Sequence, residues 1–157
     1  MRQRGFTLIE LMITLAILGL LALGVAPLAK LGVQRAKEAE LRAALRDIRT
    51  AIDAYKDAAD SGLIKKDADK TGYPPSIEVL AQGVEDIKSP DHARMVYFLR
   101  RIPRDPMNPD TTSPPEKTWG LRSYASPPDD PQPGDDVYDV YSQSPKVALD
   151  GTPYRSW

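Results

Sequence analysis

Cysteine is absent from the 157 residues of the chain, and histidine occurs once, at His92. The lack of cysteine excludes disulfides, thiolate metal sites and cysteine nucleophiles, and a single histidine excludes a zinc site with two histidine ligands. His92 directly follows Asp91. Adjacent side chains rarely face one substrate, so such a pair is more typical of a surface loop than of an active site. We therefore expect that the protein is not an enzyme.

The chain also has no large excess of positive or of negative residues. The 21 lysine and arginine residues nearly balance the 22 aspartate and glutamate residues, which gives a formal net charge of -1. A nearly neutral chain has no overall basic field that would attract a phosphate backbone. We expect no nucleic acid among the partners, and the length suits one globular domain with an anchor.

Charge is absent altogether from Leu11 to Ala29, a run of nineteen residues. At about 1.5 Å per residue, a helix of this length nearly matches the ~30 Å hydrocarbon core of a bilayer, so we expect one membrane span. A cleaved secretory signal would have a shorter apolar run of about 7 to 15 residues. Basic residues flank both ends, with Arg2 and Arg4 before the run and Lys30 after it. Charge alone therefore leaves the topology open.

The residues just before this run, from Arg4 to Glu10, read RGFTLIE. They resemble the class III signal of the type IV pilin-like superfamily. The resemblance implies that a prepilin peptidase removes residues 1–5 by cutting between Gly5 and Phe6, and that the new amine of Phe6 is then methylated. A glycine before the cut suits a protease, because the backbone can be approached closely where there is no side chain.

Three residues of the apolar helix are unusual there. Glu10 is a carboxylate flanked by apolar residues at the edge of the expected span, and a charge would cost about 2.5 to 3.5 kcal/mol at the centre of such a span. Its place in the first helical turn, where the helix dipole favours an anion, is one explanation. The resemblance implies another, in which Glu10 pairs with the N-terminal amine of a neighbouring subunit, and both explanations are open. Gly19 and Pro27 weaken the helix by about 1 and 3 kcal/mol relative to alanine. They predict a kink at Pro27, and the resemblance implies local melting between them in assembled filaments.

A helical pattern continues beyond Lys30, with apolar residues spaced three or four apart. This stripe consists of Leu41, Leu45, Ile48, Ile52 and Tyr55. The opposite face is charged and includes pairs of opposite sign at helical spacing, such as Arg49 with Asp53. No glycine lies between Gly32 and Gly62, so we expect the helix to end near residue 60. The stripe would suit a coiled coil, but a stripe of this length more often packs on the domain that follows.

Proline dominates the remainder, with fourteen of the fifteen prolines at or beyond Pro74, which favours loops and short strands. We expect Ser76 to cap a short helix over residues 76–83, and a second short helix, with a loop as the alternative, over residues 93–99. Residues 119–126 and 137–142 predict an antiparallel hairpin. The expected fold class is α+β, a pilin-like lollipop in which a long N-terminal helix, half membrane-spanning and half amphipathic, packs on a small antiparallel β-sheet.

The resemblance extends beyond the leader. The successive segments YPPSIEVL, YFLRRIPRDPMNP, WGLRSYASPPDD, DVYDVYSQSP and ALDGTPYRSW resemble the globular domain of the major pseudopilins of type II secretion. The resemblance implies a leader over residues 1–5, a transmembrane and polymerisation helix over 6–30, its amphipathic continuation over 31–60 and a periplasmic globular domain over 61–157.

In function, the resemblance implies a structural subunit that polymerises into a periplasmic pseudopilus and drives the export of folded proteins across the outer membrane. The chain would cross the bacterial inner membrane once, with its C-terminal domain in the periplasm. The implied partners are copies of the chain, minor pseudopilins, the inner-membrane secretion platform and the prepilin peptidase.

Two other functions are open. The alternative in the same class is a type IV pilin of a surface fibre, for motility, adhesion or DNA uptake, although the lack of a cysteine pair in the C-terminal loop favours secretion. A binding module for peptidoglycan or exported proteins could use Tyr138, Tyr141, Tyr154 and Trp157. Such aromatic residues more simply pack in a core.

No cofactor is required by this interpretation, but the resemblance implies that a calcium ion is often held by the C-terminal loop. Calcium takes six to eight oxygen ligands, which flexible loops supply well. The candidate ligands here are the side chain of Asp150 and main-chain carbonyls of residues 141–144. The loop is poorer in acidic residues than the family pattern, and Lys146 would weaken the site further.

Overall fold

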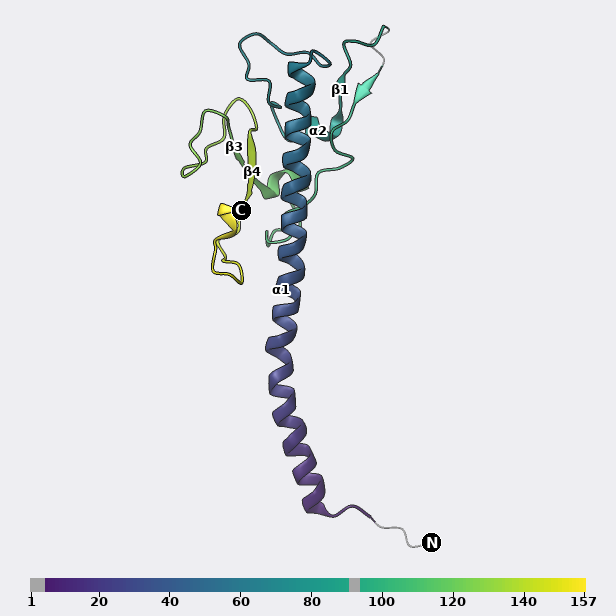
Figure 1. Ribbon diagram of the computed structural model, residues 1–157. Coiled ribbons are helices and arrows are strands. Elements are labelled where there is room, and N and C mark those ends of the chain that lie inside the picture. Colours follow the sequence, from purple (N-terminus) through teal and green to yellow (C-terminus); the bar gives the residue numbers. More distant parts are fainter. Residues whose placement is uncertain (1–4, 91–93) are drawn as a thin grey trace. The chain divides into compact units, whose positions relative to one another are not determined.

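The computed structural model, drawn in Figure 1, describes residues 5–90 and 94–157, and leaves the side chains of residues 23–28 outside that description. The chain forms two compact units, Met1–Ala36 and Lys37–Trp157. Helix α1 contributes to both, and the two units are described separately below.

Helix α1 covers Leu8–Asp60, which confirms the predicted end near residue 60. At its start, the hydroxyl of Thr7 accepts a hydrogen bond from the main-chain N–H of Glu10 at 3.3 Å, and caps the first turn. At its end, Gly62 adopts a φ of 67°, and the N–H of Leu63 donates to the carbonyl of Ala58 at 2.8 Å. This left-handed residue and its six-to-one bond form a Schellman motif, which stops the helix.

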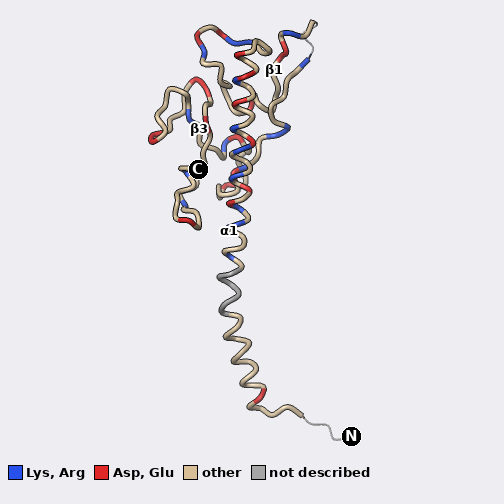
Figure 2. The backbone as a smooth tube through the Cα atoms, viewed as in Figure 1, with Lys and Arg blue, Asp and Glu red and all other residues tan. Residues whose placement is uncertain are grey.

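The first unit consists mainly of the N-terminal turns of α1, and its large apolar side chains are exposed from Leu8 to Leu21. Figure 2 shows few charged residues along this part of α1 and many along the remainder. Within the described residues, no helix combines the length and apolar character that crossing a membrane requires. The predicted span from Leu11 to Ala29 includes residues 23–28, whose side chains lie outside the description.

The second unit has a core built on the apolar stripe of α1. All five predicted stripe residues are buried, with Leu41, Ile48 and Ile52 at 0% exposure. The stripe packs in one cluster with residues from every later part of the unit, which include Ile64, Ile77, Leu80, Trp119, Val137, Val140 and Tyr154. The stripe therefore packs on the domain of its own chain, as expected.

The predicted hairpin is present, with shorter strands than expected. Strand β3, Trp119–Arg122, pairs antiparallel with β4, Asp139–Ser142, and Trp119 lies opposite Ser142. Beyond Arg122 the chain turns, and the N–H of Ser123 donates to the carbonyl of Gln132 at 3.0 Å. Short 3-10 helices precede and follow the hairpin, at Pro115–Thr118 and Tyr154–Ser156, and the sequence pattern had not indicated them.

The prediction of a second short helix over residues 93–99 is wrong for the part of this segment that the structure describes. Met95–Val96 forms strand β2, which pairs antiparallel with β1, Val84–Glu85. The N–H groups of Phe98 and Leu99 both donate to the carbonyl of Leu80, at 3.0 and 2.8 Å. The main-chain bonds of this segment therefore go to residues 80–86, which leaves no helical turn within it. Ala93 lies outside the described residues.

The first short helix exists but is shorter than predicted. Helix α2 covers Val79–Gln82, Glu78 occupies the N-cap position, and no side chain caps it. Ser76 is thus not the cap, because Ile77 turns into the core at 1% exposure and helical bonding begins only with the Leu80 N–H, 3.3 Å from the Ile77 carbonyl. Gly83 ends the helix as predicted, with a φ of 85° that suits glycine.

Candidate assembly and processing site

The predicted cleavage position lies in an extended segment before α1. Phe6 is 76% exposed, and a side chain placed on Gly5 would meet no atom of the described residues within 4 Å. Packing within the chain therefore does not require glycine at position 5, whereas the close approach of a protease would. Cleavage between Gly5 and Phe6 and methylation of Phe6 stay predictions.

Glu10 lies in the first turn of α1, as predicted, and is exposed. Its main-chain N–H donates to Thr7, but its carboxylate has no partner in the part of the chain that the structure describes. The helix dipole stabilises an anion at this position by about 0.3 to 1 kcal/mol, less than the cost of a carboxylate deep in a membrane. The carboxylate is therefore available to a group outside the chain.

Apolar side chains surround Glu10 on α1. Ten of them are between 52% and 78% exposed: Leu8, Ile9, Leu11, Met12, Ile13, Leu15, Ile17, Leu18, Leu20 and Leu21. Burying one such side chain fully contributes about 1.5 to 3 kcal/mol. A continuous exposed apolar surface of this extent indicates that lipid or another protein covers it.

Gly19 and Pro27 both fall within the bounds of α1. A side chain at Gly19 would meet nothing within 4 Å, so close packing in the chain does not explain this glycine. The side chain of Pro27 lies outside the described residues, as does the predicted kink there. Melting of the helix between these two positions stays a prediction.

In the second unit, Glu38 holds the C-terminal residues on α1. This carboxylate is only 6% exposed, and its Oε1 accepts hydrogen bonds from the Leu149 N–H at 3.0 Å and the Tyr154 hydroxyl at 2.9 Å. Hydrogen bonds to a charged group are about twice as strong as neutral ones. The sequence analysis missed Glu38, although its place one turn before Leu41 put it on the buried face.

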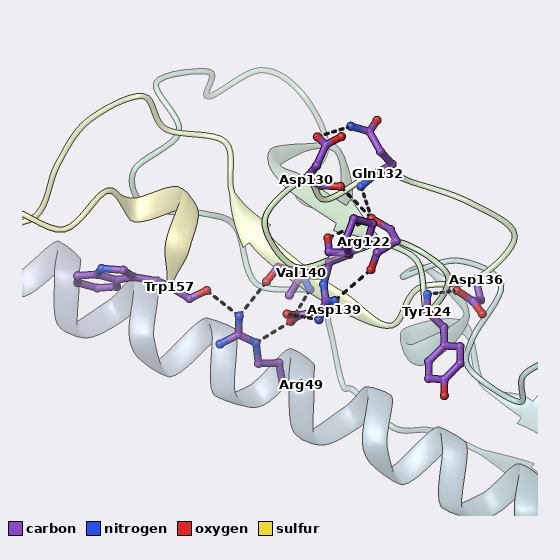
Figure 3. Close-up of polar contacts among 11 residues, drawn as sticks. Arg49, Arg122, Tyr124, Asp130, Gln132, Asp136, Asp139, Val140 and Trp157 are labelled. Carbon is purple, nitrogen blue, oxygen red and sulfur yellow. Dashed lines mark hydrogen bonds and ion pairs between the residues drawn. The ribbon is translucent and has the colours of Figure 1, made fainter.

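Arg49 makes the second attachment, shown in Figure 3. Its Nε donates to Asp139 at 2.8 Å, and one terminal nitrogen donates to the main-chain oxygens of Val140 and Trp157 at 3.2 and 2.7 Å. The predicted pair of Arg49 with Asp53 is therefore wrong. The fork-shaped guanidinium takes three acceptors from β4 and the C-terminal residues, which an exposed helix neighbour could not match.

Asp105 is a further buried anchor that the sequence analysis did not identify. It is 0% exposed, its Oδ2 accepts the Ser142 hydroxyl at 2.6 Å, and its Oδ1 accepts the Met107 N–H at 2.7 Å. These bonds attach the proline-rich segment around Asp105 to the end of β4. The only sequence signal was an acidic residue between prolines, which a solvated turn shows equally.

The residues near Asp150 fit a calcium ion poorly. Oδ1 of Asp150 accepts both the N–H and the hydroxyl of Thr152, at 2.9 and 2.7 Å. These bonds hold the pKa of Asp150 below its usual value, and the positive charge of Arg42 adds to the effect. Among the described residues, no three acidic or histidine side chains form a group suited to a metal. Calcium at Asp150 stays a prediction, and no step below depends on it.

The aromatic residues considered for a binding module are mostly engaged in packing. Tyr154 is 1% exposed and packs edge-on against Trp157, with ring centroids 5.2 Å apart. Tyr138 packs edge-on against Tyr73 at 5.0 Å. This favours the structural role for these rings. His92, the only histidine, lies outside the described residues.

Comparison with known proteins gives one matching family model and several relatives from type II secretion systems. A family model described as the prokaryotic N-terminal methylation motif matches residues 1–26. Type II secretion system core protein G of Klebsiella pneumoniae is 32% identical over 112 residues, which cover 69% of this chain and 72% of the relative. The core proteins G of Pseudomonas aeruginosa and Dickeya chrysanthemi are each 30% identical over 108 residues, covering 67% of this chain and 68% and 63% of the relatives. No solved structure matches the chain.

Proposed function

Because the chain belongs to the family of type II secretion system core protein G, we propose that it is a structural subunit of the periplasmic pseudopilus of such a system. The subunit polymerises through the N-terminal part of α1, and the polymer drives the export of folded proteins across the outer membrane. The observation that carries this proposal is the exposed apolar surface between Leu8 and Leu21.

That surface has two uses in succession. Before assembly it suits the acyl chains of a membrane, and in a filament it suits the same surface of neighbouring subunits. The methylation motif and the core protein G relatives support a membrane-anchored subunit with its globular unit in the periplasm. Anchoring in the bacterial inner membrane by a single span is the finer form of this proposal.

Processing and assembly are linked by the first residues of the mature chain. Removal of residues 1–5 creates an amine at Phe6, four residues before Glu10. The exposed carboxylate of Glu10 then pairs with the Phe6 amine of a neighbouring subunit, so that two charges are neutralised as the helices align. The match of the methylation motif to residues 1–26 supports this sequence of events.

The partners follow from membership of a secretion system. They are copies of the chain, minor pseudopilins, the inner-membrane secretion platform and a prepilin peptidase. The chain has no catalytic role in this proposal. A surface pilus for motility, adhesion or DNA uptake is less well supported, because the matched relatives are named as secretion components.

Intact-mass and N-terminal analysis of the membrane-extracted protein tests the processing step. We expect a chain that begins at methylated Phe6. A chain that begins at Met1, or beyond Ala26, would contradict the proposal.

Secretion by a strain that lacks the gene tests the function itself. We expect wild-type protein to restore export and filament formation, and Glu10→Ala to reduce both by at least about tenfold, since the loss of one charge-assisted contact exceeds ~1.4 kcal/mol. Thr14→Ala, a change in the same exposed helix, is the matched control. Normal export without the protein would overturn the proposed function.

A further inference from the structure

Three arginines form a stripe on the part of α1 that belongs to the second unit. Arg42, Arg46 and Arg49 are spaced by four and three residues, so they lie on one face of the helix. Like charges at this spacing repel one another and destabilise a helix. Anionic groups, main-chain oxygens or aromatic rings near the three arginines are therefore needed to offset this repulsion.

Two of the three arginines have that compensation within the chain. Arg49 is bonded to Asp139 and to two main-chain oxygens. Arg42 stacks over the ring of Trp157 at 4.3 Å from its centroid. Arg46, between them, is exposed and has no side-chain partner in the described parts of the chain. One positive charge of the stripe is left for a group from outside.

The stripe also lines a hollow in the surface. Arg42, Arg46 and Arg49, together with Leu45, Asp150 and Trp157, surround an open groove of about 310 Å³. Arg49 is paired with Asp139 and Arg42 lies near Asp150, so the charge of Arg46 is the one that the groove leaves to attract an anion. A carboxylate suits it best, because guanidinium binds carboxylate oxygens through two parallel hydrogen bonds.

An exposed acidic turn elsewhere in the same unit carries the complementary charge. Asp129 and Asp130 lie between prolines at positions 127, 128 and 131, and both are exposed. Asp129 has no side-chain partner among the described residues, and the side chain of Asp130 accepts only the amide of Gln132, at 2.8 Å. Adjacent like charges at the tip of a loop are also unfavourable without a partner.

The acidic turn is held in shape by its own hydrogen bonds, several of which are drawn in Figure 3. The hydroxyl of Ser126 donates to the Asp130 carbonyl at 3.1 Å and accepts the Gln132 N–H at 2.8 Å. The prolines restrict the backbone further. A preorganised loop loses little conformational entropy when it binds, so the turn is suited to recognition.

We propose that the acidic turn around Asp129 of one subunit docks in the arginine groove around Arg46 of the next subunit. The proposal rests on the proposed function, since a polymer brings identical chains into contact. Two different patches that bind each other form a heterologous contact, which repeats along a filament without closing on itself. Each subunit then supplies the acidic turn at one contact and the groove at the other.

Disulfide trapping tests this contact, because the natural chain contains no cysteine. A chain that carries both Arg46→Cys and Asp129→Cys, oxidised within assembled filaments, is expected to give a ladder of covalent oligomers. A ladder requires that position 46 of one chain meets position 129 of the next. Arg46→Cys with Lys117→Cys is the matched control, since Lys117 is exposed and lies outside both patches, and it should give no ladder.

Filaments that form but give only dimers, an internal disulfide or no disulfide would overturn the proposed contact and leave the proposed function intact. A wild-type chain that forms no filaments at all would contradict both.

Charge exchange supplies an independent measurement. Arg46→Glu and Asp129→Lys are each expected to lower the yield of filaments by about tenfold, because each variant sets like charges against one another across the contact. The double variant is expected to restore most of the yield. Both positions are exposed and unpaired in the chain, so the midpoint of thermal unfolding should not change. Equal yields from all four proteins would overturn the proposal.

Discussion

Glu38 shows how one carboxylate can fix the end of a chain. It is nearly fully buried, yet both of its described donors come from the last nine residues, Leu149 and Tyr154. A buried carboxylate is tolerated only when such donors satisfy it, and the donors in turn need the carboxylate. The hydrogen bonds from Leu149 and Tyr154 therefore replace water at the Glu38 carboxylate, and they attach the C-terminal residues to α1.

Replacement of Glu38 by alanine is expected to lower the free energy of unfolding by about 2 to 3 kcal/mol, because a buried hydroxyl and a partly buried N–H lose a charged acceptor. Glu38→Gln keeps one acceptor oxygen and should cost less. Urea denaturation measures both, and Glu40→Ala, at an exposed position two residues away, should change stability by less than about 0.5 kcal/mol. Equal stability of Glu38→Ala and wild type would show that other contacts hold the segment.

At this scale the sequence predicted some residues and not others. The exposed Glu10 and the buried stripe residues followed from helical periodicity and from position in the first turn. The partner of Arg49 did not, because Asp139 is 90 residues away along the chain and Asp53 is only one turn away. Periodicity reports the face on which a side chain lies, and says nothing of which distant strand supplies its partner.

Among the elements, length decided which predictions succeeded. Helix α1 has 53 residues with a sustained apolar period in its second half, and its end was predicted closely. Strands β1 and β2 have two residues each, and each residue of β1 pairs with a residue of β2 that lies about a dozen positions later in the chain. A segment of that length has no measurable period, so the bonds to residues 80–86 decided its structure and the expected helix was wrong.

The C-terminal segment also allows a prediction about metal removal. A ligand that binds only the folded state raises the midpoint of thermal unfolding with its concentration. Since Glu38 and Arg49 hold this segment and Asp150 is engaged by Thr152, we expect a calcium chelator to leave the midpoint unchanged. The matched measurement adds calcium in excess. A midpoint that rises with calcium would show that Asp150 and nearby carbonyls bind the ion after all.

For the whole molecule, the division into two units matters more than any single contact. Among the described residues, the core cluster lies at or beyond Leu41, within the second unit, and the large apolar side chains of the first unit from Leu8 to Leu21 are exposed. The sequence-based prediction ended the apolar helix at residue 30 and kept residues 31–60 as a separate amphipathic continuation, whereas the two units divide after Ala36. The second unit is therefore suited to water, and the first unit is suited to lipid or to an apolar protein surface.

Residues 37–157, produced alone, are expected to fold in water as a monomer, because the cluster that stabilises the second unit is complete without residues 1–36. Circular dichroism, thermal unfolding and size-exclusion chromatography measure the result. The full chain, without detergent, is the comparison and should associate through its exposed apolar residues. An unfolded fragment would show that the first turns of α1 contribute to the stability of the second unit.

The bond between Tyr154 and Glu38 joins residues that are 116 positions apart in the chain. Since Glu38 is made early and Tyr154 late, the second unit cannot complete its fold while the last residues are still being synthesised. Contacts of such long sequence separation also slow folding, because a large loop must close before they form. The second unit therefore stays incompletely folded until Tyr154 has been made, and an incompletely folded polypeptide is the form that can be threaded through a membrane before it folds on the other side.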